Sequence, residues 1–151
     1  MQQETVDSFK VVDQNNRGYI IQIDYDRVPF NAQAQFVVSG VTEPPVTRGG
    51  HAHKECDQFL ICLSGEIEIQ SFVWEDTCED TPDTVNLLSD KRVLHAGDYF
   101  HLPPQHLCYQ KYKTQDSTLL VLASHSYDPD DAINSINDLY FYMKEKNENS
   151  I

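Results

Sequence analysis

The sequence is short of cations and has no long apolar run. Its 151 residues include 11 Lys and Arg against 24 Asp and Glu, which gives a formal net charge of −13. Nucleic acids and anionic membranes bind through positive protein surfaces, so this balance argues against both as partners. The chain also lacks the apolar stretch of about 18 residues that a membrane helix needs.

Cysteine is scarce as well. No CxxC pair occurs among Cys56, Cys62, Cys78 and Cys108, which argues against a disulfide framework. The opening MQQETVDSFK contains no apolar segment of the kind found in a signal peptide. We therefore expect a cytoplasmic protein with reduced thiols. With 40% hydrophobic residues, the chain can bury a core, and we expect one domain over residues 1–151.

Short stretches typical of β-strands fill most of the chain. They are rich in β-branched, aromatic and other apolar residues, and Gly, Pro, Asn or Asp residues separate them. The clearest stretches are Tyr19–Ile23, Gln35–Val38, Gln58–Leu63, Glu66–Phe72 and Leu119–Ala123. Many short strands joined by turns predict an all-β antiparallel barrel or jelly roll.

The pattern changes after Tyr127. Asp128 is a good helix cap and Pro129 suits a first helical position, and further acidic residues follow in the first turn. These features predict a helical tail over about 128–146. The predicted fold is therefore a strand barrel with a short C-terminal helix.

Two histidines stand one residue apart in the stretch RGGHAHKECDQFLICLSG. His51 and His53 point to the same face if this segment is a strand. Inside a barrel, two imidazoles with an ordinary pKa of about 6.5 could take and give protons at neutral pH. The same pair could instead hold a metal ion or simply fill the barrel.

The chain resembles the cupin superfamily in the spacing of two short motifs, at His51, His53, Gln58 and Gly65 and again at Gly97, Pro103 and Cys108. Metal-binding cupins usually carry three histidines and a glutamate, whereas the four matching positions here are His51, His53, Gln58 and Cys108. Gln58 is a poor ligand because it is neutral. Two histidines and a cysteine remain a chemically possible open site, so a metal-dependent cupin enzyme is one alternative.

A narrower resemblance covers roughly residues 5–140. The stretches NNRGYI, RGGHAHK, QFLICLSG, LLVLAS and SYDPDD together resemble the dTDP-sugar 3,4-ketoisomerases, the WxcM-like C-terminal family of cupins. The resemblance implies an enzyme of deoxysugar biosynthesis, such as that of lipopolysaccharide, without metal or other cofactor. Such enzymes move the ketone of dTDP-4-keto-6-deoxyglucose from C4 to C3 through an enediol. The resemblance also implies a homodimer that exchanges N-terminal strands.

By position, the resemblance implies that His51 and His53 are the catalytic acid and base, without fixing which is which. Arg48 would face the diphosphate, where a guanidinium can hold two oxygens. Arg17 is a second candidate for substrate binding and could reach a partner subunit. The expected substrate-binding set is completed by His101, Gln58 and Cys108.

The chain departs from the family on the strand before the histidine pair. Family members usually have an arginine and one or two tyrosines there, and the aligned residues are Ala34, Val37 and Ser39. Three explanations stay open. The protein is a ketoisomerase with a reorganised site, an enzyme for a different keto sugar, or a non-catalytic cupin that binds a sugar nucleotide or a partner.

Overall fold

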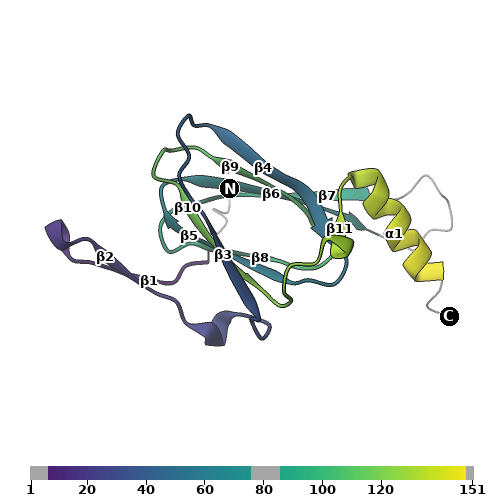
Figure 1. Cartoon of the computed structure of the whole chain (residues 1–151), viewed down its shortest axis with the longest axis horizontal. Helices are drawn as coiled ribbons and strands as arrows, with labels where there is room; N and C mark the ends of the chain where they lie inside the picture. The colour runs from purple at the N-terminus through teal and green to yellow at the C-terminus, as the bar shows by residue number, and fades with distance from the viewer. Residues whose placement is uncertain (1–6, 76–85, 149–151) are drawn as a thin grey trace.

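The computed structural model describes residues 7–75 and 86–148, which form two facing β-sheets, a separate β-hairpin and one α-helix (Figure 1). The strands are β1 (Lys10–Asp13), β2 (Tyr19–Gln22), β3 (Ala34–Val38), β4 (Val46–His53), β5 (Gln58–Ser64), β6 (Ile67–Glu75), β7 (Asn86–Leu94), β8 (Tyr99–Leu102), β9 (Leu107–Tyr112), β10 (Thr118–Ala123) and β11 (Ala132–Ile133). The helix α1 spans Ile136–Glu148. The predicted antiparallel barrel with a short C-terminal helix is confirmed.

One sheet has the strand order β3-β10-β5-β8 and the other β11-β4-β9-β6-β7, with antiparallel pairing throughout. The inner faces of the two sheets meet in an apolar core. Its fully buried members include Leu60, Ile67, Ile69, Leu94 and Leu119. Strand β6 explains why alternating polar and apolar residues predicted a strand here. Its inner residues are buried and alternate with partly exposed ones such as Glu68 and Gln70.

The outer faces of the sheets are covered differently. Phe9 and Val28, from the N-terminal segment, pack with Phe59 and Ile61 on the outside of β5. That cover buries β5 on both faces, as its unbroken apolar sequence predicts. Helix α1 packs at one end of the outer face of the other sheet, where its Leu139 joins a third buried cluster with Ala52, Leu107 and Ile133.

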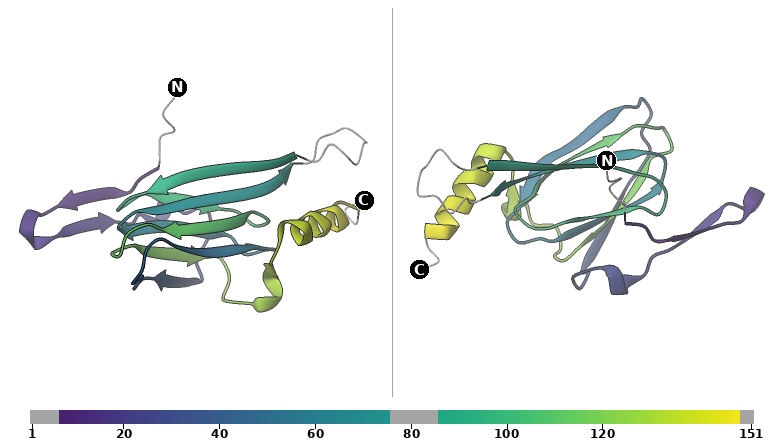
Figure 2. Two further views of the ribbon diagram at one scale, coloured as in Figure 1. Left: turned by 90° about the horizontal axis from the view of Figure 1, so that it is seen from above. Right: turned by 180° about the vertical axis from the view of Figure 1, so that it is seen from behind.

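The β1–β2 hairpin projects from one end of the barrel, and α1 lies at the opposite end (Figure 2). Gln14–Gly18 form the turn of the hairpin, which includes a short 3₁₀ helix at Asn15–Arg17. Arg17 is therefore held at the tip, far from the body of the barrel (Figure 1).

The predicted start of the helical tail at residue 128 is wrong. Asp128 does act as a cap, because its side chain accepts a hydrogen bond from the N–H of Asp130 at 3.0 Å. It caps only a 3₁₀ turn at Pro129–Asp131, after which β11 pairs with β4. The α-helix starts later, where the Ser135 hydroxyl accepts a hydrogen bond from the N–H of Asp138. Pairing with the edge of β4 thus replaces the first helical turns.

No helix in the parts of the chain that the structure describes is long and apolar enough to cross a membrane.

Candidate active site

The histidine pair lies at the end of β4, after a bulge. The register between β4 and β9 shifts between Gly49 and His51, and His51 then stands opposite Cys108. Gly49 has φ +96°, and a Cβ atom there would lie 2.5 Å from the carbonyl oxygen of Cys108. Only glycine fits this close approach, and the bulge turns His51 to the face of β9 that carries Cys108.

His51 and His53 lie together as the strand alternation predicts. Their ring centres are 5.6 Å apart and the ring planes are perpendicular. His51 is exposed, whereas the His53 side chain is only 17% exposed. Burial lowers the pKa of His53, and the charge of His51 lowers it further, while Asp131 opposes the shift. His53 is therefore mainly neutral at pH 7 and able to accept a proton.

Two side chains fix the orientation of the His53 ring. The Oδ2 atom of Asp131 lies 3.3 Å from its Nδ1 atom, and the Gln58 amide nitrogen lies 3.3 Å from its Nε2 atom. The Asp131 contact is electrostatic, because no hydrogen bond of good geometry reaches Nδ1 from the described residues. A carboxylate beside Nδ1 and an amide donor beside Nε2 both favour the tautomer with its proton on Nδ1.

Asp131 is itself held in place. Its Oδ1 and Oδ2 atoms accept hydrogen bonds from the backbone N–H groups of Glu55 at 2.9 Å and Cys56 at 3.2 Å. Sequence reasoning missed this residue, which looked like one more acid in a helical first turn. The stretch SYDPDD resembled the family, but no spacing rule connects it to His53.

The interior beside the histidines contains further polar groups. Cys108, Gln110 and Tyr112 alternate along the inner face of β9, and the Tyr112 hydroxyl donates to the Gln110 side-chain oxygen at 2.9 Å. Burial raises the pKa of the Cys108 thiol to about 12, so the thiol is protonated at neutral pH. Ser71 of β6, only 5% exposed, stands opposite Cys108 in the register.

Arg48 belongs to the same face of the sheet. It pairs in register with Gln110, and its charge partly opposes the effect of burial, which raises the pKa of Tyr112 to about 12. Arg48 is exposed, so a ligand at the histidines could contact it. Arg17, at the hairpin tip, is not brought near this group within one subunit (Figure 1).

His101 does not join the site. It pairs in register with Phe59, whereas the neighbouring Leu102 pairs with Gln58. Phe59 faces outward into the N-terminal cover and Gln58 faces the histidines, so His101 is on the opposite side of the sheet. Its Nε2 atom lies 2.7 Å from Asp57, and its ring packs near Phe30.

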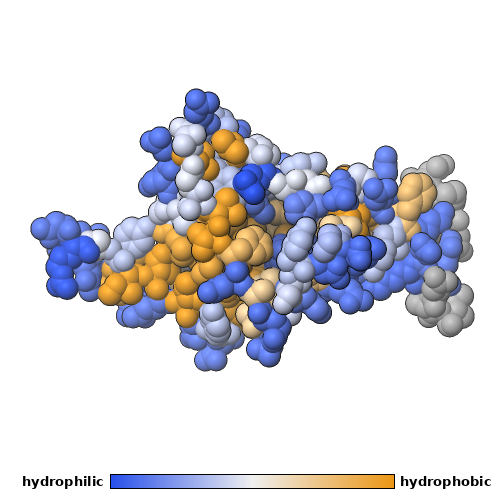
Figure 3. All heavy atoms as spheres, viewed as in Figure 1, coloured by the Kyte–Doolittle hydropathy of each residue, from blue (hydrophilic) through white to orange (hydrophobic). Residues whose placement is uncertain are grey.

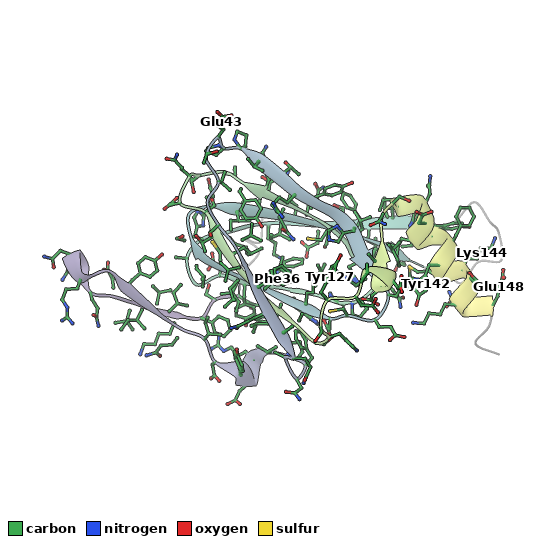
Figure 4. The ribbon with its side chains drawn as sticks, viewed as in Figure 1. Phe36, Glu43, Tyr127, Tyr142, Lys144 and Glu148 are labelled. Atoms are coloured by element: carbon green, nitrogen blue, oxygen red, sulfur yellow. The ribbon has the colours of Figure 1, made fainter. Side chains whose placement is uncertain are left out.

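Strand β3 contributes no polar side chain to the interior. Ala34, Phe36 and Val38 pair with the inward residues of β10, and Val37 points to the outside, where it is 55% exposed. Figure 4 labels Phe36 on the middle of this strand. The family's arginine and tyrosines therefore have no polar counterpart on β3, and donors for a substrate must come from other strands.

The donor set does not fit a metal. Within residues 7–75 and 86–148, no three His, Cys, Asp or Glu side chains are grouped so that they could hold an ion. Cys108 is buried and protonated, and the Nε2 atom of His53 faces the Gln58 amide.

The comparison with protein families agrees with the geometry. Residues 2–145 match the model of the family described as WxcM-like, C-terminal. The chain belongs to this family. The match to the WxcM-like C-terminal family takes in both sheets, the hairpin and most of the helix, so the predicted membership is confirmed.

Named relatives and solved structures are similar to this chain at low identity. The TDP-4-oxo-6-deoxy-alpha-D-glucose-3,4-oxoisomerase of Aneurinibacillus thermoaerophilus is 25% identical over 151 residues, covering 97% of this chain and 96% of the relative. A double mutant of the QdtA 3,4-ketoisomerase from Thermoanaerobacterium thermosaccharolyticum, solved with TDP, is 26% identical, with a TM-score of 0.68 and 94% of each chain covered. The WlaRB TDP-quinovose 3,4-ketoisomerase of Campylobacter jejuni is 25% identical, with a TM-score of 0.65 over 87% of this chain and 92% of that one.

Proposed function

We propose that this protein is a sugar-nucleotide 3,4-ketoisomerase that acts on a dTDP-linked 4-keto-6-deoxyhexose in deoxysugar biosynthesis. The observation that carries the proposal is the perpendicular pair of His51 and His53, whose rings are 5.6 Å apart on an inward-facing strand end. The relatives described above catalyse this reaction or one of the same type on TDP-sugars.

The reaction is an internal redox exchange. A base removes the C3 proton while the C4 oxygen gains a proton, which gives an enediol. The C3 hydroxyl then loses its proton and C4 gains one, so that C3 is oxidised to the ketone and C4 is reduced to the alcohol. No external oxidant or reductant is consumed, and two groups that exchange protons near neutral pH are sufficient.

The histidine pair supplies these groups. His53 is mainly neutral and has Nε2 as its basic nitrogen, and Asp131 stabilises the imidazolium that forms when this nitrogen takes a proton. His51 is the exposed partner in ring contact with it. We assign proton removal and return to the pair as a unit.

The proposed substrate contacts come from both sheets and face the interior between them. Arg48 holds the diphosphate oxygens, and Gln58 and Cys108 line the position of the hexose beside the histidines. His101 is left out of the proposed site, because it lies on the other face of its sheet.

The proposal includes a homodimer that exchanges N-terminal strands. On one face of the hairpin, the Tyr19 hydroxyl donates to the carbonyl of Leu63 at 2.6 Å. The other face carries Val12 and Ile20, and Ile20 is 48% exposed. Figure 3 shows apolar surface on the hairpin that continues onto the barrel. A second subunit would cover the surface and could receive Arg17 near its active site.

Proton NMR of dTDP-4-keto-6-deoxyglucose incubated with the protein in D2O tests the proposal. We expect loss of the C3 proton signal and the appearance of a 3-keto product. Exchange without product would show that the C3 proton is removed but that the acid that must serve C4 is missing or mismatched. No exchange by a folded protein would overturn the proposed activity, and binding of dTDP measured by calorimetry would then support a non-catalytic sugar-nucleotide-binding cupin.

A further inference from the structure

Arg92 of β7 faces the interior between the two sheets. It pairs in register with Ile69 of β6, a fully buried core residue, and directly opposite residues of an antiparallel pair project to the same face. The guanidinium carbon also lies 5.4 Å from the ring centre of Phe100, which is buried in the opposite sheet. Arg92 therefore extends from β7 toward β8 across the inside of the barrel.

The register connects Arg92 to the candidate active site. One row of inward positions runs across the sheet through Arg92, Ile69, Gln110 and Arg48. The next row runs through Asp90, Ser71, Cys108 and His51. The inward rows that hold Arg92 and His51 are therefore neighbours on one face of the sheet, with β9 and β6 between the strands of the two residues.

The protein provides partners for only some of the nitrogen atoms of the Arg92 guanidinium. One terminal nitrogen lies 3.3 Å from the Asp90 carboxylate, which positions the group. The Nε atom is buried and has no hydrogen-bond partner among the described residues. A buried N–H without an acceptor is unfavourable. A bound oxygen that accepts from this N–H would remove the deficit.

The reaction requires such a donor. Negative charge develops on the oxygens at C3 and C4 as the enediol forms, and a fixed cation in a sheltered site stabilises that charge strongly. Strand β3 provides no polar inward side chain, and the histidines are occupied with proton transfer. We propose that Arg92 donates hydrogen bonds to these sugar oxygens and is a further catalytic residue. This role rests on the proposed ketoisomerase function.

Substitutions at Arg92 separate charge stabilisation from nucleotide binding. Arg92→Gln should lower kcat and the rate of C3 proton exchange by on the order of 10²-fold, as removal of an oxyanion donor does. Its Kd for dTDP, which has no hexose, should stay within about twofold, because Arg48 holds the diphosphate. Arg92→Lys keeps the positive charge but lacks the several fixed N–H donors of a guanidinium, and its kcat should fall roughly tenfold. Added guanidinium ion should partly restore Arg92→Ala.

The neighbour Lys91 is the matched control. Its side chain is 58% exposed and pairs with Glu68 on the outer face, so Lys91→Gln should leave kcat and the Kd for dTDP unchanged. Arg92→Gln with near-normal kcat, or with weakened dTDP binding in place of reduced turnover, would overturn the role of Arg92 and leave the isomerase proposal intact. A wild-type protein without C3 exchange would overturn both.

Discussion

The Nδ1 atom of His53 on β4 lies 3.3 Å from the Oδ2 atom of Asp131, in the 3₁₀ turn that precedes β11. Two backbone N–H groups after β4 bind the same carboxylate, and β11 pairs with β4 directly beside it. The orientation of the buried histidine is therefore set by the C-terminal segment. Catalysis should depend on a residue that belongs to neither sheet's core.

Asp131→Asn should lower kcat by roughly 10- to 100-fold, part of the gain that positioned acid–base groups provide. The amide leaves the shape almost unchanged, but it no longer stabilises a positive charge on His53. The KM should change little, because Asp131 does not face the substrate. Asp130→Asn is the matched control, since Asp130 is an exposed neighbour in the same turn. Equal activity of the two variants would contradict the role of Asp131.

The pH dependence of kcat/KM should report the lowered pKa of His53. Because burial and the charge of His51 both lower this pKa, the acid limb should fall below the ordinary histidine value of about 6.5. Asp131 raises the pKa, so its removal in Asp131→Asn should move the acid limb to still lower pH. An acid limb that moves upward in this variant would show that another group titrates.

His101→Gln should keep kcat within about threefold of the wild-type value, because His101 lies outside the catalytic face. The contact with Asp57 is partly exposed, so its loss should cost no more than about 1 kcal/mol of unfolding free energy. Activity assays and urea unfolding check the two values. A large loss of kcat at unchanged stability would place His101 back among the catalytic groups.

The histidine pair could be predicted because alternation along a strand is a local property. His51 and His53 share a face whatever the rest of the chain does. His101 could not be placed in the same way, because its face depends on its register with β5. A shift of one residue between Phe59 and Gln58 decides whether it points into the barrel.

Asp131 and Arg92 could not be found from the sequence for a related reason. Each belongs to a charged stretch that is typical of a solvated surface, namely SYDPDD and SDKR. The strand pairings bring Asp131 to His53 and place Arg92 beside Ile69. Contacts between distant segments decide the role of such residues, whereas the strands themselves followed from short-range apolar patterns.

Gly49→Ala should destabilise the fold more than Gly40→Ala does. Both glycines have positive φ, which costs a residue with a Cβ atom roughly 1–2 kcal/mol. Only at Gly49 would the Cβ atom meet the Cys108 carbonyl at 2.5 Å, and nothing lies within 4 Å at Gly40. The clash should add roughly 1–3 kcal/mol and displace His51. Urea unfolding measures the loss of stability, and kcat reports the displacement of His51. Equal losses of unfolding free energy in the two variants would show that the bulge leaves room for a Cβ atom.

Arg17 and His51 should complement each other between subunits. The hairpin holds Arg17 at its tip, away from the barrel of its own chain, so in an exchanged dimer it would serve the partner's site. Arg17→Ala and His51→Asn should each be nearly inactive alone. Co-expressed, they form mixed dimers with one intact site, and about a quarter of wild-type activity should return. His53→Asn with His51→Asn is the control, because each barrel of such a mixed dimer carries one of the two lesions and neither site is intact. Recovered activity in that control would contradict a site built from two chains. So would a co-expressed pair of Arg17→Ala and His51→Asn that recovers no activity.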